Sequence, residues 1–352
     1  MHYRAKTPDR LKKHYNFRLL RLIDEYLRGQ RWNLFLEMRY LLTAAFGLYY
    51  TVSMALLAIF LIITARKREK SENRDRSIYE NFSITVIIPA CDEQTVIVGT
   101  VKNINAHNYP GPLEIIVVDD DKSKDENEDN TSPKPSTSDC LVEAFKMEPA
   151  ADVAFRENRL AAKPIRRILY KKLGKNTLYV IDKDNGGKSD ALNAGINICS
   201  NDWFVCVDAD TYLCDDAFMR LVDVIIDHPD VIAVGGRVRP RQTKVNDSLL
   251  THILGDIQLI EYVKAFLLTR PAFDEIGGLL LISGAFGIFR TKVVAEISGY
   301  SRRTKGEDFE LTIRLQNYCR YHEIEHGIRY CRDAVCETLL PINLRDLCRQ
   351  RS

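Results

Sequence analysis

The 352-residue sequence lacks a strong excess of charge of either sign. Its 50 lysines and arginines face 48 aspartates and glutamates, so the formal net charge is only +2. Nucleic-acid binding depends on basic patches that cover phosphates, and this balance gives no case for them. We therefore expect no nucleic-acid partner.

The sequence also lacks paired cysteines. Its nine cysteines show no C-x-x-C pair and no regular spacing. Several lie inside apolar runs, where a cysteine acts as a small hydrophobic residue. The pattern favours reduced cysteines in a cytosolic compartment over a disulfide framework.

A complete P-loop is missing as well. Residues 185–189 read NGGKS, like the tail of G-x-x-x-x-G-K-[ST], but the first glycine would fall at position 182, where Asp182 stands. What remains is a flexible turn with Lys188 at the start of a predicted helix. A lysine beside a helix N-terminus suits an anion such as a diphosphate, and a plain strand-to-helix turn is the alternative.

One long apolar run is present. Residues 41–64 contain no charged side chain. At ~1.5 Å per residue, a helix of this length spans a hydrocarbon core of ~30 Å. A core helix and a signal peptide are the alternatives, but the run starts far from the N-terminus and is followed by Arg66-Lys67-Arg68. The run therefore predicts a transmembrane helix, with the lipid bilayer as a partner.

Basic segments flank this run on both sides. Residues 1–40 carry an apolar stripe and an arginine-rich face, which predicts an interfacial helix on an anionic membrane. A soluble amphipathic helix packed on the main domain is the alternative. Residues 65–82 form a basic juxtamembrane linker. The positive-inside rule, applied to these segments, favours the inner cell membrane with the main domain on the cytoplasmic side.

From residue 83 to residue 352 the pattern indicates a single α/β domain. Apolar β-branched runs alternate with helical stretches, which predicts a mostly parallel sheet with helices on both faces. Residues 121–175 read as a surface insertion, with a solvated linker and a helix-prone segment at 151–172. The predicted strands cover residues 85–88, 115–118, 178–181, 204–207 and 231–234.

Chemical groups follow four of these strands. They are Ala90 to Glu93, Asp119 to Asp121, Lys183 to Lys188, and Asp208-Ala209-Asp210. Ligands of open α/β sheets bind at the carboxyl ends of the strands, so these groups should converge on one crevice. Carboxylates brought together repel one another unless a cation lies among them. Asp208 and Asp210 can hold Mg²⁺ or Mn²⁺ between them, and a simple helix cap is the alternative for this D-x-D alone.

The last third contains a second group of candidate residues. Residues 282–290 form a small-residue run, and Glu307 and Asp308 stand at the start of a predicted helix. A carboxylate at a helix N-terminus can be a cap. It can also be a general base, if the fold places it over the crevice.

These motifs together resemble a known family. VIIPACDE, IIVVDDD, DNGGKSDALNAG, VCVDADT, SGAFGIFR and KGEDFEL occur in the order found in family 2 inverting glycosyltransferases. The resemblance is to the membrane-bound, polysaccharide-synthase-like kind, such as poly-N-acetylglucosamine, hyaluronan and cellulose synthases. It covers about three quarters of the chain. It implies the GT-A fold of nucleotide-diphospho-sugar transferases.

The resemblance also implies roles. The chain would transfer a sugar from a UDP-sugar, UDP-GlcNAc or UDP-Glc first, to a glycan or polysaccharide acceptor, with inversion and with Mg²⁺ or Mn²⁺. Asp308 would be the catalytic base, and Gly284, Glu307 and Gln350 would lie on the acceptor side. The residues implied to bind the nucleotide sugar are Ala90, Glu93, Asp119, Asp120, Lys188, Asp208 and Asp210, the last two through the metal.

Three positions depart from the family pattern. Asp121 stands where relatives have glycine, and Glu337 and Leu339 replace the tryptophan and glutamate of C-W-T-E-x-P. Gln350 begins the family's Q-x-x-R-W, and we expect the chain to be cut short before the Arg-Trp pair. A membrane-anchored protein that binds nucleotide sugars without turnover is therefore the alternative, and a sugar nucleotidyltransferase is a more distant one.

Overall fold

The computed structural model describes residues 37–63, 74–120, 135–151, 153–156, 160–241, 249–304, 306–341, 345 and 347–348. The chain divides into two compact units, with the boundary between Ile62 and Ile63. The predicted interfacial segment lies outside the described residues up to residue 36, and so does the basic linker from 64 to 73.

The described part of the first unit is a helix, Glu37–Ile63, whose last residue falls just past the boundary. It has 27 residues, and none of its most apolar 18-residue window is buried. By length and composition it can cross a membrane, and among the described residues it is the one helix that can. The apolar run predicted to be helical is helical through residue 63.

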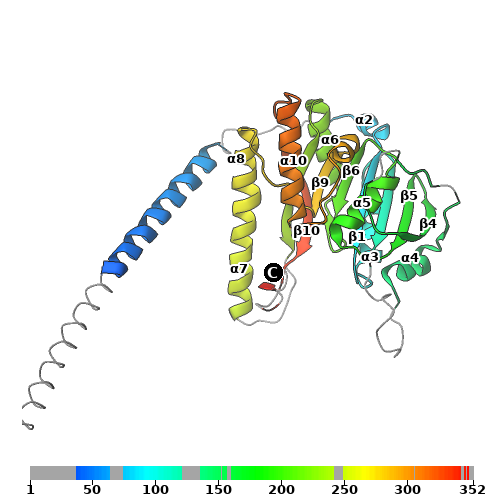
Figure 1. Ribbon diagram of the computed structural model, residues 1–352, viewed down its shortest axis with the longest axis horizontal. Helices are drawn as coiled ribbons and strands as arrows, with labels where there is room; N and C mark the ends of the chain where they lie inside the picture. Colours follow the sequence, from blue (N-terminus) through cyan, green and yellow to red (C-terminus); the bar gives the residue numbers. More distant parts are fainter. Residues whose placement is uncertain are drawn as a thin grey trace, which may run out of the picture. The chain divides into compact units, whose positions relative to one another are not determined.

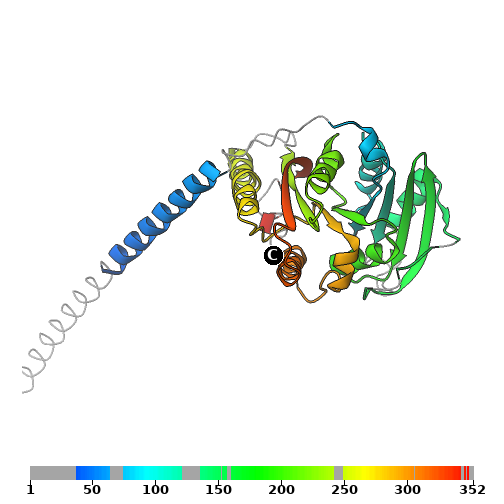
Figure 2. The ribbon, with the colours of Figure 1, turned by 90° about the horizontal axis from the view of Figure 1, so that it is seen from above.

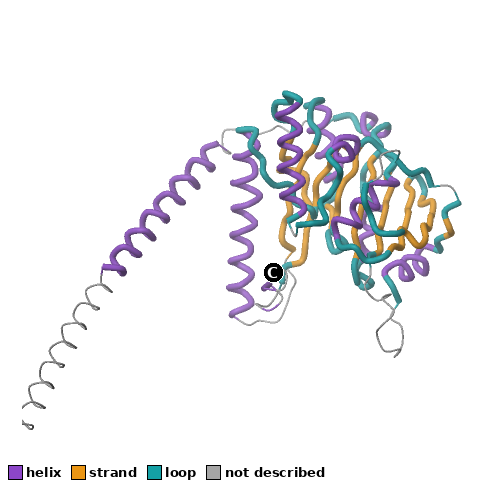
Figure 3. The backbone as a smooth tube through the Cα atoms, in the orientation of Figure 1, coloured by secondary structure: helices purple, strands orange, loops and turns teal. Residues whose placement is uncertain are grey.

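The second unit is built on one sheet, which in the described residues has ten strands. Figure 3 shows these strands side by side with helices around them. The central strands are apolar along their whole length, because both faces of the sheet are covered. The strands are β1 (Ile84–Ala90), β2 (Leu113–Asp119), β3 (Glu148–Pro149), β4 (Ile165–Leu173), β5 (Asn176–Lys183), β6 (Trp203–Val207), β7 (Tyr212–Leu213), β8 (Ala233–Arg241), β9 (Phe286–Arg290) and β10 (Ile328–Leu339).

The strand order is β3-β4-β5-β2-β1-β6-β9-β8-β10-β7. The neighbours β5, β2, β1 and β6 run parallel, and β8 runs parallel to β10. The strand β9 is antiparallel to both β6 and β8, so the sheet is mixed. The predicted α/β class is confirmed, but the sheet is mixed rather than mostly parallel. The parallel strands bring the carboxyl ends of β1, β2, β5 and β6 to one edge.

Helices cover both faces of this sheet. In Figure 2, α3 and α6 lie on one face and α5 and α10 on the other. Figure 1 shows α7 beyond β10. The helices are α2 (Ser77–Glu80), α3 (Ile97–Asn105), α4 (Thr137–Phe145), α5 (Lys188–Ile198), α6 (Ala217–Asp227), α7 (Leu249–Val263), the π-helical η2 (Lys264–Thr269), α8 (Arg270–Glu275), α9 (Thr291–Glu296) and α10 (Glu307–Tyr321).

One local prediction is wrong. Residues 151–172 read as helix-prone, yet residues 165–173 form β4, which pairs antiparallel with β5. The hairpin turns at Gly174, whose φ of 64° favours glycine. Arg166 and Arg167 of β4 both pair with Asp182 of β5, at 2.7 and 2.9 Å. Cross-strand pairing therefore overrides the local helix propensity.

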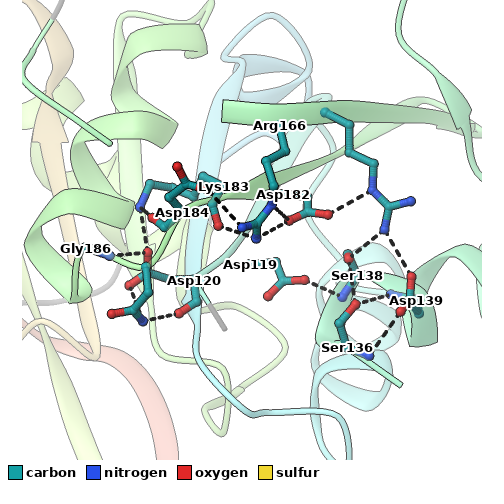
Figure 4. A network of polar contacts seen from close by, with 12 residues as sticks. Asp119, Asp120, Ser136, Ser138, Asp139, Arg166, Asp182, Lys183, Asp184 and Gly186 are labelled. Carbon is teal, nitrogen blue, oxygen red and sulfur yellow. Dashed lines mark hydrogen bonds and ion pairs between the residues drawn. The ribbon is translucent and has the colours of Figure 1, made fainter. Parts of the chain in front are cut away.

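A buried ammonium joins the ends of these elements. The side chain of Lys183, at the end of β5, is 0% exposed. Its Nζ lies 2.6 Å from Asp120 Oδ1, after β2, and 2.7 Å from Asp190 Oδ1, in α5. Figure 4 shows Lys183 and Asp120 beside the Asp182 pairs. Lys183 therefore links the ends of β2 and β5 to the first turn of α5 through ion pairs.

The substitution Lys183→Met should lower the free energy of unfolding by about 3–5 kcal/mol, because it removes the buried cation that pairs with Asp120 and leaves Asp190 with its ion pair to Arg302. Urea unfolding followed by circular dichroism measures this. The matched control is Lys171→Met in the same hairpin, whose ion pair with Glu148 is exposed at 3.4 Å. The control should cost less than about 1 kcal/mol. Equal losses in the two variants would contradict this role of Lys183.

Candidate functional site

A cavity of about 410 Å³ lies at the carboxyl ends of β1 and β6, beside the start of α5. The sequence predicted a crevice at this edge. Six of the seven residues predicted to bind the nucleotide sugar line the cavity: Ala90, Glu93, Asp120, Lys188, Asp208 and Asp210. The fold therefore brings together groups that lie as much as 120 positions apart in the sequence.

Asp120 shapes one wall of the cavity. Its carboxylate accepts hydrogen bonds from the backbone N–H groups of Gly186 and Gly187, at 2.9 and 2.7 Å. Gly187 has a φ of 86° and directly precedes α5, so the turn requires glycine there. A Cβ on Gly186 would lie 2.5 Å from Cγ of Asp190. The two glycines thus let the backbone wrap closely around buried carboxylates.

Asp119 is placed differently from its neighbour. It is fully buried, and its Oδ2 accepts a hydrogen bond of 2.9 Å from the backbone N–H of Ser138 in α4. In Figure 4, Asp119 points toward Ser138, whereas Asp120 points toward Gly186. Successive side chains of a strand alternate between faces, which explains the difference. Binding of uridine by both aspartates stays a prediction.

Lys188 bridges the two sides of the site. Its Nζ lies 2.7 Å from Asp208 Oδ1 and 3.8 Å from Glu307 Oε1. Burial lowers the pKa of Lys188, but the charges of Asp208, Asp308 and Glu307 outweigh it and raise that pKa above its usual value. Lys188 is therefore a permanent cation between the D-x-D motif and the first turn of α10.

Asp308 lies in that first turn, beside Glu307. Its Oδ2 accepts a hydrogen bond of 2.8 Å from the backbone N–H of Gly284. Burial raises the pKa of Asp308 to about 6, although Lys188 acts in the opposite direction. A carboxylate with such a pKa can accept a proton near neutral pH. Gly284 was predicted on the acceptor side, and its observed contact is with Asp308.

Asp208 and Asp210 could hold a divalent cation. Desolvation and the charge of Asp208 raise the pKa of Asp210, so a cation beside them would relieve their repulsion. Within the described residues, no group of three or more histidine, cysteine, aspartate or glutamate side chains could hold a metal. Magnesium needs only one or two protein carboxylates when phosphates and water complete its shell. The donor set therefore fits Mg²⁺ or Mn²⁺.

The sequence assigned no role to some residues of the site, and one predicted residue, Gln350, lies outside the described residues. Lys183 and Asn185 belong to the predicted 183–188 group but received no role of their own, and Asp190 was given none either. Asn185 lines the cavity and donates a hydrogen bond to the carbonyl of Asp120. One signal was available, since a lysine that ends an apolar strand must find buried carboxylate partners.

Comparison with known proteins points to one family. Residues 165–297 match the family described as Glycosyl transferase family 2. The chain is 26% identical over 312 residues to the poly-beta-1,6-N-acetyl-D-glucosamine synthase of Staphylococcus aureus strain COL, which covers 87% of this chain and 63% of that protein. It is 30% identical over 167 residues to the Staphylococcus epidermidis enzyme of the same name, covering 47% of this chain and 37% of that one. The chain thus spans less than two thirds of these relatives.

One solved structure supports the fold. The mannosyltransferase PcManGT from Pyrobaculum calidifontis, solved in complex with GDP-Man and Mn²⁺, aligns with a TM-score of 0.50 and 16% identity. The alignment covers 86% of this chain and 71% of that one. The mixed sheet with its ligand cavity at one edge agrees with this likeness. Residues 165–297 therefore resemble glycosyl transferase family 2, and the second unit has the GT-A fold.

Proposed function

We propose that the chain is an inverting glycosyltransferase that moves a sugar from a UDP-sugar to a glycan or polysaccharide acceptor. One observation carries this proposal. The D-x-D carboxylates, Lys188 and Asp308 form a single cluster, in which Lys188 pairs with Asp208 at 2.7 Å and with the neighbour of Asp308 at 3.8 Å. The relatives named above are poly-N-acetylglucosamine synthases, so UDP-GlcNAc is the first donor to test and UDP-Glc the second.

In the proposed reaction Asp308 is the general base. It takes the proton of an acceptor hydroxyl while the hydroxyl oxygen bonds to C1 of the donor sugar. The bond from C1 to the diphosphate oxygen breaks at the same time, and UDP leaves with the electron pair. A single displacement inverts the anomeric centre. The Gly284 N–H holds the Asp308 carboxylate in place for this step.

Positive charge is needed at the departing diphosphate. We propose that Asp208 and Asp210 hold Mg²⁺ or Mn²⁺, which supplies Lewis-acid stabilisation of the leaving group when bound. Lys188, in the same cavity, offers an ammonium to the diphosphate.

We further propose that the helix Glu37–Ile63 anchors the enzyme in the inner cell membrane. The apolar side chains of this helix are exposed, so they suit a lipid environment. The basic residues that follow it favour a cytoplasmic catalytic domain.

The direct test is a transfer assay on the full chain in detergent with UDP-GlcNAc, Mn²⁺ and a glycan acceptor. We expect UDP release with a β-linked product, loss of activity on chelation by EDTA, and a kcat about 10²–10⁴-fold lower in Asp308→Asn. UDP-GlcNAc binding, measured by calorimetry, should survive this substitution. Binding without turnover in the unsubstituted chain would instead support a nucleotide-sugar-binding protein.

The proposed base also predicts a pH dependence. Asp308 must be deprotonated to accept a proton, and its pKa is raised to about 6. The kcat/KM should therefore be level above this pH and fall about tenfold per unit below it. Initial rates between pH 4.5 and 8 measure this acidic fall in kcat/KM. The residual activity of Asp308→Asn should not show the fall. A profile that stays flat through pH 5 would exclude Asp308 as the base.

A substitution at Gly284 tests whether the position of Asp308 matters for catalysis. A Cβ at this position would lie 2.4 Å from both carboxylate oxygens of Asp308. Gly284→Ala should therefore displace Asp308 and lower kcat by about 10²-fold, because a misplaced base loses most of its effect. Gly99→Ala in α3 is the control, since a Cβ there meets nothing within 4 Å. If both variants keep full activity, the close packing at Gly284 does not position the base.

A further inference from the structure

The site holds more negative than positive charge. Asp208, Asp210, Glu307 and Asp308 lie close enough for their charges to act on Lys188 or on one another. Lys188 contributes a single positive charge and contacts Asp208 most closely, at 2.7 Å. The carboxylate that would take a metal is therefore already paired with an ammonium from the chain itself.

We propose that Lys188 is an internal cation latch: it occupies Asp208 in the donor-free protein and leaves it for the diphosphate when the nucleotide and a divalent cation enter together. The proposal rests on the function proposed above for this site and adds an order to the binding. A metal that enters alone must displace the ammonium without compensation. A metal that enters with a diphosphate gives the ammonium a new anion.

The structure allows this movement at little cost. The side chains of Lys188 and Asp208 keep 35% and 32% of their surface exposed, so the pair can open without unpacking the core. The backbone of the preceding turn is held by the bond from Gly187 to Asp120. Lys188 can therefore turn its flexible four-carbon stem while its Cα stays in place.

The latch has consequences of opposite sign for two ligands. When the Lys188 ammonium is removed, Asp208 loses its ion pair, and a metal should bind the donor-free protein more tightly. The cavity then also lacks a cation for phosphate, and UDP should bind more weakly. A cation that met the diphosphate but lay far from Asp208 would change only the second affinity in this way.

The test measures Mn²⁺ binding to the full chain in detergent by electron paramagnetic resonance, with and without UDP. Without UDP, Lys188→Gln should bind Mn²⁺ about fivefold more tightly, the scale of a partly exposed ion pair. Lys292→Gln is the charge-matched control, since Lys292 is 81% exposed and pairs only loosely with Glu296, at 3.9 Å. It should leave Mn²⁺ binding unchanged. Lys188→Arg, which keeps the charge, should stay close to the unsubstituted protein.

Two further measurements locate the effect. Adding Asp208→Asn to Lys188→Gln should abolish the gain, and UDP should raise Mn²⁺ affinity by a larger factor in the unsubstituted protein than in Lys188→Gln. Mn²⁺ binding that is unchanged or weaker in Lys188→Gln would overturn the latch, as would equal coupling to UDP in the two proteins. Neither result depends on turnover, so the glycosyltransferase proposal would stand or fall separately on the transfer assay.

Discussion

The arrangement of the site depends on one buried ammonium. Lys183 has no exposed side-chain surface and contacts carboxylates from two other elements, at 2.6 and 2.7 Å. Removing charges from water costs several kcal/mol per ion, which a good pairing geometry offsets. The cluster is held further because Asp190 also accepts hydrogen bonds from Arg302 and from the backbone N–H of Lys163, both at 2.9 Å. The positions of β2, β5 and α5 are therefore set by electrostatics as well as by apolar packing.

Two lysines flank the loop between β5 and α5, and the difference in their burial gives them different roles. Lys183 is enclosed by acceptors that all belong to the protein, so it has no charge to offer a ligand. Lys188, five residues later, lies at the cavity with a third of its side-chain surface exposed. A ligand can compete for the second ammonium but not for the first. The sequence alone does not distinguish the two lysines, because their difference in burial depends on the fold.

The sheet and the edge that holds the site could be predicted from the sequence, because the central strands are apolar runs and ligands bind where parallel strands end. The conformation of residues 165–173 could not, since it depends on pairing with β5 and on the ion pairs of Asp182. Strand alternation implies that Asp119 and Asp120 point to opposite faces, but their partners could not be predicted. These are Ser138 and Gly186, which lie 19 and 66 positions away.

Glycines and carboxylates are linked throughout the site. A carboxylate that is withdrawn from water needs replacement donors, and backbone N–H groups can supply them only if the backbone comes close. Asp120 obtains such donors from Gly186 and Gly187, and Asp308 obtains one from Gly284. At Gly186 and Gly284 a Cβ would come within 2.5 and 2.4 Å of carboxylate atoms. Gly186 and Gly284 are therefore required by the acids beside them, because a larger residue at either position would displace a carboxylate from the donors that hold it.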